Sequence, residues 1–103
     1  MSKIKVLYKE QGKRAEVKEI ENTLEALQAA VGGYIETVTL ATDAVIICDE
    51  EGLLKGKEYN CHIGDVGFVG TIIMAGVAGD EFADCQTSVE VFESRCAKDK
   101  RRN

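Results

Sequence analysis

The sequence predicts an α+β domain, with a mostly antiparallel sheet of four or five strands, one helix packed on a face and a second helix at the C-terminus. Two short segments, residues 44–48 and 71–75, are nearly all apolar, as expected for strands that are covered on both faces. Residues 23–31 carry apolar side chains at helical spacing. The connections between the expected strands are short, which favours antiparallel pairing.

A hairpin is expected at the start of the chain. Residues 4–8 alternate between two faces, and residues 9–14 are polar and contain the glycine that a turn prefers. Residues 15–20 indicate a weaker second strand with one charged face, which is typical of a sheet edge. The side chains that share one face of the first strand, opposite Leu7, are those of Ile4, Val6 and Tyr8.

The clearest helix is expected over residues 23–31. Asn22 is a favourable N-cap residue, and Glu25 lies three positions later, where its carboxylate can reach back to the cap amide. The helix should end at Gly32 or Gly33, because glycine adopts the left-handed conformation without a Cβ penalty. The apolar residues expected on its buried face are Leu24, Leu27 and Val31.

The middle of the chain combines clear strands with one segment that has no period. Residues 34–40 alternate polar and apolar side chains, and a tight connection joins them to the apolar strand at 44–48. Residues 49–52 predict an acidic turn. Residues 53–69 show no period, so a long ordered loop or short irregular elements are expected there. A long loop in a compact domain is often functional.

The last part of the chain predicts a strand, a turn and a helix. The strand at 71–75 is followed by residues 76–80, which contain two glycines and are expected to turn the chain. Arg95 lies near the end of the expected helix, where the helix dipole favours cations. The residues that indicate this helix, because they lie on one helical face, are Val89, Phe92 and Cys96.

Length and charge restrict the class of protein. The 103 residues suit a single α+β domain over residues 1–97, followed by a basic tail at 98–103. The tail holds four basic and one acidic side chain, so residues 1–97 hold 9 basic and 17 acidic ones, a net charge of −8. An acidic body repels phosphates, so nucleic acid is not an expected partner. No leader or membrane segment is visible, which predicts a cytoplasmic protein without membrane partners.

The cysteines and the histidine do not form a recognisable metal pattern. The chain has four cysteines but no Cys-x-x-Cys pair, and its single histidine, His62, directly follows Cys61. Adjacent side chains rarely bind one metal ion together, so we expect neither a metal site nor a cofactor. Reduced thiols are expected, with Cys48 in a strand core and Cys96 on a helix face.

No catalytic residues are expected, and the protein is predicted not to be an enzyme. A nucleophile needs a base and an orienting group, and the side chains of the neighbours Cys61 and His62 point apart on an extended chain. Pairing of His62 with Cys48 or Cys85 through the fold is the alternative. The carboxylates of residues 49–51 and of residues 80–84 lie in expected turns, where a solvated surface explains them.

A ligand site is expected in the segment of residues 53–70. Glycines at 64, 67 and 70 can present backbone N–H groups to a phosphate, although turn glycines are the simpler explanation. Two aromatic side chains, Tyr59 and Phe68, can stack on a base or pack the loop onto the sheet. The residues expected to contact a ligand are Tyr59, Asn60, His62 and Gly67.

Several segments together resemble a known family. The likeness is carried by residues 17–28, the sequence Val-Gly-Gly-Tyr-Ile-Glu at 31–36, the strand and acidic turn at 43–52, Asn60 and the strand start at 70–71. Over about residues 3–80 the chain resembles a family of small uncharacterised domains found in phages, conjugative elements and Gram-positive bacteria. The resemblance implies a genetic setting, with host-cell cytoplasm as the location if the protein is phage-encoded. It implies no assigned activity and no catalytic residues.

Two hypotheses for the function follow. In the first, the protein is a non-enzymatic accessory binding protein of a phage or mobile element that can form a homo-oligomer. It would antagonise host defence by sequestering a small nucleotide-like signal. In the second, it is an acidic inhibitor that mimics nucleic acid and occupies a basic groove of a host protein, with Asp49, Glu50 and Glu51 in the contact surface.

Overall fold

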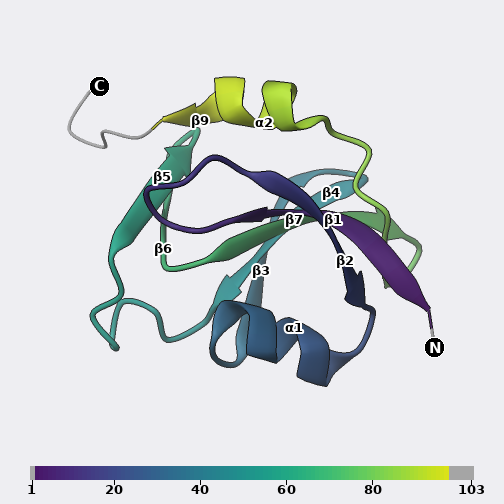
Figure 1. Cartoon of the computed structure of the whole chain (residues 1–103), viewed down its shortest axis with the longest axis horizontal. Helices are drawn as coiled ribbons and strands as arrows, with labels where there is room; N and C mark the ends of the chain where they lie inside the picture. The colour runs from purple at the N-terminus through teal and green to yellow at the C-terminus, as the bar shows by residue number, and fades with distance from the viewer. Residues whose placement is uncertain (1, 98–103) are drawn as a thin grey trace.

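A six-stranded main sheet, a three-stranded small sheet and two helices make up residues 2–97, the part of the chain that the computed structural model describes (Figure 1). The main sheet has the order β2-β1-β7-β4-β3, with β8 also paired to β7, and the small sheet has the order β6-β5-β9. The strands of the main sheet are β1 (Lys3–Lys9), β2 (Glu16–Glu21), β3 (Ile35–Ala41), β4 (Ala44–Asp49), β7 (Ile72–Ala78) and β8 (Glu81–Ala83). The remaining elements are α1 (Leu24–Val31), β5 (Tyr59–Ile63), β6 (Val66–Val69), α2 (Val89–Arg95) and β9 (Cys96–Ala97).

The fold confirms the predicted α+β class and antiparallel pairing. Every strand pair in both sheets is antiparallel. The main sheet has one strand more than the four or five expected, and the small sheet was not expected. The basic tail predicted at 98–103 lies outside the described residues. Within residues 2–97, neither helix has the length and apolar character that a membrane span requires.

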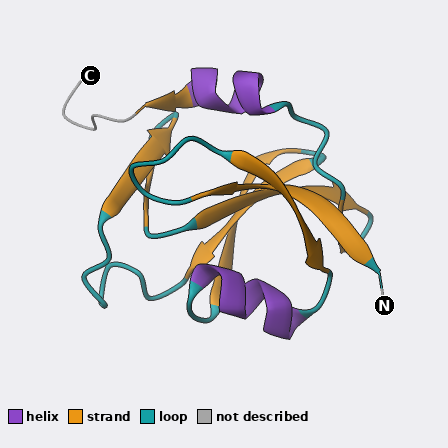
Figure 2. Ribbon diagram, in the orientation of Figure 1, coloured by secondary structure: helices purple, strands orange, loops and turns teal. Residues whose placement is uncertain are grey.

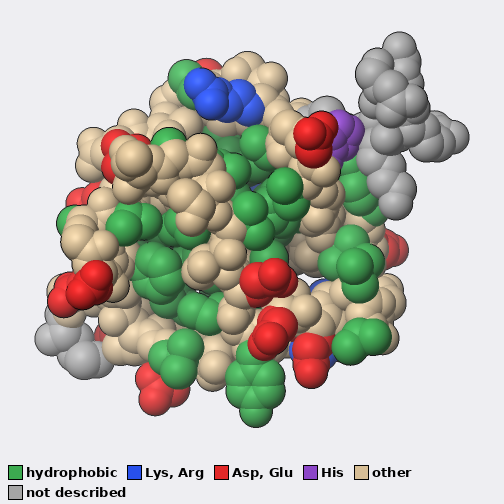
Figure 3. Space-filling view, turned by 180° about the vertical axis from the view of Figure 1, so that it is seen from behind, with side chains coloured by type: hydrophobic (Ala, Val, Ile, Leu, Met, Phe, Trp, Pro, Cys, Tyr) green, Lys and Arg blue, Asp and Glu red, His purple; other side chains and the backbone are tan. Residues whose placement is uncertain are grey.

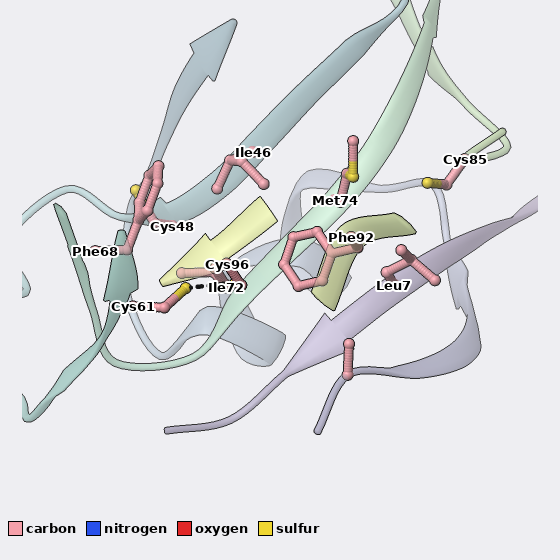
Figure 4. Close-up of a cluster of buried hydrophobic side chains, with 11 residues drawn as sticks. Leu7, Ile46, Cys48, Cys61, Phe68, Ile72, Met74, Cys85, Phe92 and Cys96 are labelled. Atoms are coloured by element: carbon pink, nitrogen blue, oxygen red, sulfur yellow. Dashed lines mark hydrogen bonds between the residues drawn. The ribbon is translucent and has the colours of Figure 1, made fainter. Parts of the chain in front are cut away.

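The main sheet is the middle of three layers. Helix α1 covers one face, and α2 with the small sheet covers the other (Figures 1 and 2). Successive residues of β4 and β7 enter the two cores alternately, as expected for a strand covered on both faces. The core beneath α1 contains Ile4, Val6, Leu27, Val31, Val45, Ile47, Ile73 and Ala75. The opposite core includes Leu7, Ile46, Cys48, Phe68, Ile72, Met74 and Phe92 (Figure 4).

The expectation of a long loop over residues 53–69 is wrong for the second half of this segment, where β5 and β6 form a hairpin. A bulge explains the missing period: Tyr59 pairs with Val69, whereas Cys61 pairs with Phe68. Because of the bulge, Asn60 and Cys61 are both buried although they are adjacent. Two consecutive buried residues break the alternation by which a strand is recognised.

The N-terminal boundary of α1 differs from the prediction, whereas its C-terminal boundary agrees with it. The N-cap is Thr23, whose Oγ1 accepts a hydrogen bond from the Ala26 amide at 3.1 Å. Asn22 instead donates its side-chain amide to the Phe82 carbonyl at 3.1 Å. Gly32 ends the helix in the left-handed conformation, with φ of 83°. Leu24 is 55% exposed, because at the first position of the helix it lines a surface hollow and not the core.

The C-terminal ends of β7 and α2 also differ from the expectation. Strand β7 continues through Gly76 to Ala78, so the turn expected over residues 76–80 is limited to residues 79–80. Glycine is needed at position 76 inside the strand, since a Cβ there would lie 2.2 Å from the Asp84 carbonyl oxygen. Helix α2 ends at Arg95, and Cys96 therefore belongs to strand β9 and not to a helix face.

The carboxylate of Asp49, at the end of β4, is buried and binds two lysines. Its Oδ2 lies 2.9 Å from Nζ of Lys55 and 2.7 Å from Nζ of Lys57, and its Oδ1 accepts a hydrogen bond from the Glu51 amide at 2.9 Å. The Asp49 side chain is only 1% exposed. The expectation of a fully solvated acidic turn is therefore wrong for Asp49, although Glu50 and Glu51 are exposed.

The same two lysines bind the C-terminal end of α1. Lys55 donates to the Gly32 carbonyl at 3.0 Å, and Lys57 donates to the Val31 carbonyl at 2.8 Å. These carbonyls are among those that a helix leaves without an internal partner, and the helix dipole attracts cations to them. Gly33 gives the ion pairs room, because a Cβ there would lie 2.5 Å from Nζ of Lys55 and 2.6 Å from Oδ1 of Asp49.

Burial alone would raise the pKa of Asp49, but the hydrogen bonds from Lys57 and Lys55 outweigh burial and hold the pKa well below its usual range. The charged form of Asp49 is therefore the one that the folded protein stabilises. We call the cluster of Asp49, Lys55 and Lys57 with the last carbonyls of α1 the Asp49 cluster.

Replacing Asp49 by asparagine should lower the free energy of unfolding by about 2–4 kcal/mol, because two lysines lose their anion. The cost stays at or below that of a fully buried pair, since both lysines are partly exposed and can turn toward water. Urea unfolding of Asp49→Asn measures the change. Glu50→Gln, an exposed neighbour, is the matched control and should change the free energy by less than about 0.5 kcal/mol. Equal midpoints for the two variants would contradict the assignment.

The contribution of Asp49 should also depend on pH in a defined direction. The folded-state pKa lies below the unfolded-state value of about 4, so the stabilisation is complete above that value and is lost as the pH falls through the folded-state pKa. The difference in unfolding free energy between wild type and Asp49→Asn isolates this group from the other carboxylates. Urea unfolding at stepped pH from about 7 to 3 should show the difference shrinking only below about pH 4. A constant difference would argue against the depressed pKa.

Candidate functional site

A cavity among the described residues lies between α2, the β3–β4 turn and the β5–β6 turn. Its volume is about 660 Å³, within the range of small-molecule sites. Its apolar lining includes Leu40 of β3, Met74 of β7 and Phe92 of α2. Figure 3, which views the molecule from behind Figure 1, shows hydrophobic side chains gathered in the middle of the face below α2. We call this cavity the α2 groove.

Four polar side chains line the α2 groove. Arg95 comes from the last turn of α2 and Asp43 from the β3–β4 turn, and both are exposed. Thr39 of β3 and Thr87, which precedes α2, add hydroxyl groups. Within residues 2–97 no ion pair involves Arg95, whereas Arg14 lies 3.8 Å from the carboxylate of Glu90. A guanidinium beside an apolar surface can bind an anion through paired N–H donors.

Three of the four ligand residues predicted from the sequence come together on the small sheet, outside the α2 groove. The Tyr59 hydroxyl and His62 Nδ1 lie 2.7 Å apart, and His62 stands opposite Gly67 in the β5–β6 register. A Cβ at Gly67 would be 3.9 Å from the Tyr59 ring, so the ring lies over this glycine. Tyr59 and His62 are half-buried. The α2 groove receives instead the next two residues of the hairpin, Ile63 and Gly64.

The fourth predicted ligand residue, Asn60, is buried inside the protein. Its amide donates to the Lys9 carbonyl at 3.0 Å and to the Gly70 carbonyl at 2.7 Å, and it is 4% exposed. These bonds fasten β5 to the end of β1 and to Gly70, the residue that follows β6. Both amide hydrogens of Asn60 are thus used within the chain, and only Oδ1 has no partner in the described structure.

The residues considered for catalysis or metal binding are dispersed. The described residues contain no cluster of three or more His, Cys, Asp or Glu side chains that could hold a metal ion. Cys61 faces the core while its neighbour His62 pairs with Tyr59. Burial, with the charges of Glu36 and Asp49, raises the pKa of Cys48 to about 11, so its thiol stays protonated at neutral pH.

The α2 groove is not visible in the sequence, because its walls come from four separate segments. Arg95 attracts attention there only as a cation at a helix end, and Asp43 only as a turn residue. The one local signal is the glycine at position 64, which has φ of 60° and makes the turn between β5 and β6.

Asn60 and Tyr59 should respond differently to substitution. Asn60→Leu removes the side-chain donor of two buried carbonyls and should lower the free energy of unfolding by about 2–4 kcal/mol. Tyr59→Phe removes only a hydroxyl at a half-buried site, where water can replace it, and should cost less than about 1 kcal/mol. Thermal or urea unfolding of both variants makes the comparison. A larger loss for Tyr59→Phe would reverse the roles assigned to the two side chains.

Comparison with known proteins identifies a family but no activity. Residues 4–96 match the model of a family described as "Domain of unknown function (DUF3846)", which confirms the resemblance to an uncharacterised domain family. No curated protein and no solved structure matches the chain. The match spans nearly the whole chain, including both sheets and both helices up to Cys96. The chain therefore belongs to the DUF3846 family of domains of unknown function.

Proposed function

We propose that this protein is a non-enzymatic binding protein that holds a small, nucleotide-like anion in the α2 groove. The observation that carries the proposal is Arg95, an arginine without an ion pair among the described residues, at an apolar groove on an acidic body. A guanidinium that pairs with no anion among the described residues offers two parallel N–H donors to a phosphate. The chain has a formal net charge of −5, and Arg95 is the one cation in the described lining of the groove.

The lining suits the remainder of such a ligand. Leu40 and Val91 offer apolar surface against which a base can pack, and Val91 is 45% exposed. The Asp43 carboxylate can accept hydrogen bonds from ribose hydroxyls or an exocyclic amine, and the threonine hydroxyls can donate or accept. Shape comes from the apolar lining and orientation from a few polar groups, which is the usual division in small-molecule sites.

The composition of the groove favours binding over catalysis. Its described lining contains one carboxylate and neither a histidine nor a thiol. A hydroxyl nucleophile is activated by an adjacent general base, and a reaction that needs both an acid and a base uses two titratable groups. A protein that sequesters a ligand needs affinity alone.

The genetic setting expected from the sequence suggests a biological role for such binding. A family carried by phages and mobile elements would gain from removing a nucleotide signal used in host defence, in the host cytoplasm.

The competing hypothesis of an acidic inhibitor loses one of its contact residues. Asp49 is buried and paired with Lys55 and Lys57, so it cannot present its charge to a basic groove. Glu50 and Glu51 remain exposed but are only two charges on one turn. Recognition by mimicry of a phosphate array requires an extended row of charges.

Binding of a nucleotide panel tests the proposal. Calorimetry with linear and cyclic mono- and dinucleotides should find at least one ligand, and the unphosphorylated nucleoside should bind much more weakly. Arg95→Gln should weaken binding of that ligand by about tenfold or more, since a charge-assisted hydrogen bond is lost. Arg14→Gln, the same change outside the groove, is the control and should leave affinity unchanged.

Two outcomes would reject this assignment. The absence of both binding heat and a thermal shift with every compound of the panel would argue against a nucleotide-like ligand. Equal affinities of wild type and Arg95→Gln would place the anion elsewhere.

A further inference from the structure

Two thiols meet in the core between the small sheet and α2. Sγ of Cys61 on β5 lies 2.9 Å from Sγ of Cys96 on β9 (Figure 4). Cys61 is 0% and Cys96 is 8% exposed. They are 35 positions apart in the sequence, so the fold alone brings them together.

The pairing of β5 with β9 explains the meeting. Ile63 stands opposite Cys96 in the antiparallel register, and Cys61 precedes Ile63 by two residues. Side chains two residues apart on a strand share a face, so Cys61 and Cys96 form a diagonal cross-strand pair on the inner face of the small sheet. Phe68 and Phe92 belong to the same core and restrict the positions that the two side chains can take.

The two other cysteines have separate surroundings. The Cys48 thiol donates to the Glu36 carbonyl at 3.7 Å, and the Cys85 thiol donates to the Thr87 carbonyl at 3.7 Å. The described structure thus contains one close thiol pair, and the remaining cysteines serve as internal controls.

We propose that Cys61 and Cys96 are a site of reversible oxidation, at which an intramolecular disulfide joins β5 to β9. This inference does not depend on the ligand proposed for the α2 groove. It concerns a covalent modification in the interior, and it holds whether or not a nucleotide binds.

The oxidant is a low-molecular-weight disulfide such as oxidised glutathione. The Cys96 thiolate attacks one sulfur of the oxidant, which forms a mixed disulfide and releases one glutathione thiolate. The Cys61 thiol then loses its proton to solvent and attacks Sγ of Cys96, which breaks the mixed disulfide and releases the second glutathione. The two protein thiols lose two electrons and two protons in total, and one oxidised glutathione becomes two reduced ones.

The order of these steps follows from access and acidity. Strand β9 has two residues at the edge of the small sheet, so its local opening is the shortest path by which an oxidant reaches the pair. The hydrogen bond from Cys96, together with burial, raises the pKa of Cys61, which makes Cys61 the slower nucleophile. Oxidation should therefore be slow, and reduction of the product should also be slow because it requires β9 to open again.

The bridge would fix the chain directly after Arg95. It closes the segment from 61 to 96, which includes β6, β7, β8 and α2. Removing the freedom of this segment in the unfolded state should raise the melting temperature by about 10 °C relative to the reduced protein.

Thiol counting and peptide mapping test the proposal. The full chain is incubated with oxidised glutathione under native conditions, then denatured, and its thiols are alkylated. The reduced protein has four reactive thiols, and the oxidised monomer should have two. Trypsin cleavage after Lys57, Arg95 and Lys98 separates the two cysteines, so the short peptide of residues 96–98 should appear joined to the peptide of residues 58–95 only without reductant.

Matched variants assign the partner within the longer peptide, which also contains Cys85. Cys85→Ser should form the bridge as wild type does, whereas Cys61→Ser and Cys96→Ser should retain all remaining thiols. Cys96→Ser, at the end of the described chain, covers the case in which Cys61→Ser does not fold. Four thiols after oxidation, a bridge to Cys48 or Cys85, or a product that is only a mixed disulfide or a cross-linked dimer would overturn the proposal.

Discussion

The ion pairs of Asp49 with Lys55 and Lys57 join three parts of the protein at one point. The Asp49 cluster joins the end of the central strand β4, the turn after it and the last carbonyls of α1. Each lysine is shared between a carboxylate and a helix carbonyl, so the turn and the helix are placed together. The chain continues from this turn into β5. The Asp49 cluster therefore fixes the point from which the small sheet begins.

The small sheet in turn positions the α2 groove. Asn60 fastens β5 to the end of β1 and to Gly70. Glu93 of α2 accepts a hydrogen bond from the Ala15 amide at 2.7 Å. These contacts hold the hairpin and α2 over the same face of the main sheet. The groove is the space that remains between them, with Arg95 at the end of the helix. A buried polar side chain such as Asn60 thus supports the site without lining it.

Sequence patterns predicted the elements whose signals are local, and they failed where distant contacts decide. Strands β4 and β7 are apolar runs, and α1 ends where glycine permits a left-handed residue, so these features follow from neighbouring residues alone. The bulge at Asn60 conceals β5, since two adjacent residues face inward. Asp49 lies among acidic neighbours and its burial depends on lysines six and eight positions later in an irregular turn. Neither contact has a period from which it can be inferred.

The strands at the two ends of the order β2-β1-β7-β4-β3 differ in the charges that they expose. Strand β2 exposes Glu16, Lys18, Glu19 and Glu21, so a second molecule that added its own β2 there would bring like charges close together. Strand β3 exposes Glu36 and two threonines. Acidic side chains therefore flank the backbone groups of the β2 edge, where like charges on two copies would oppose extension of the main sheet.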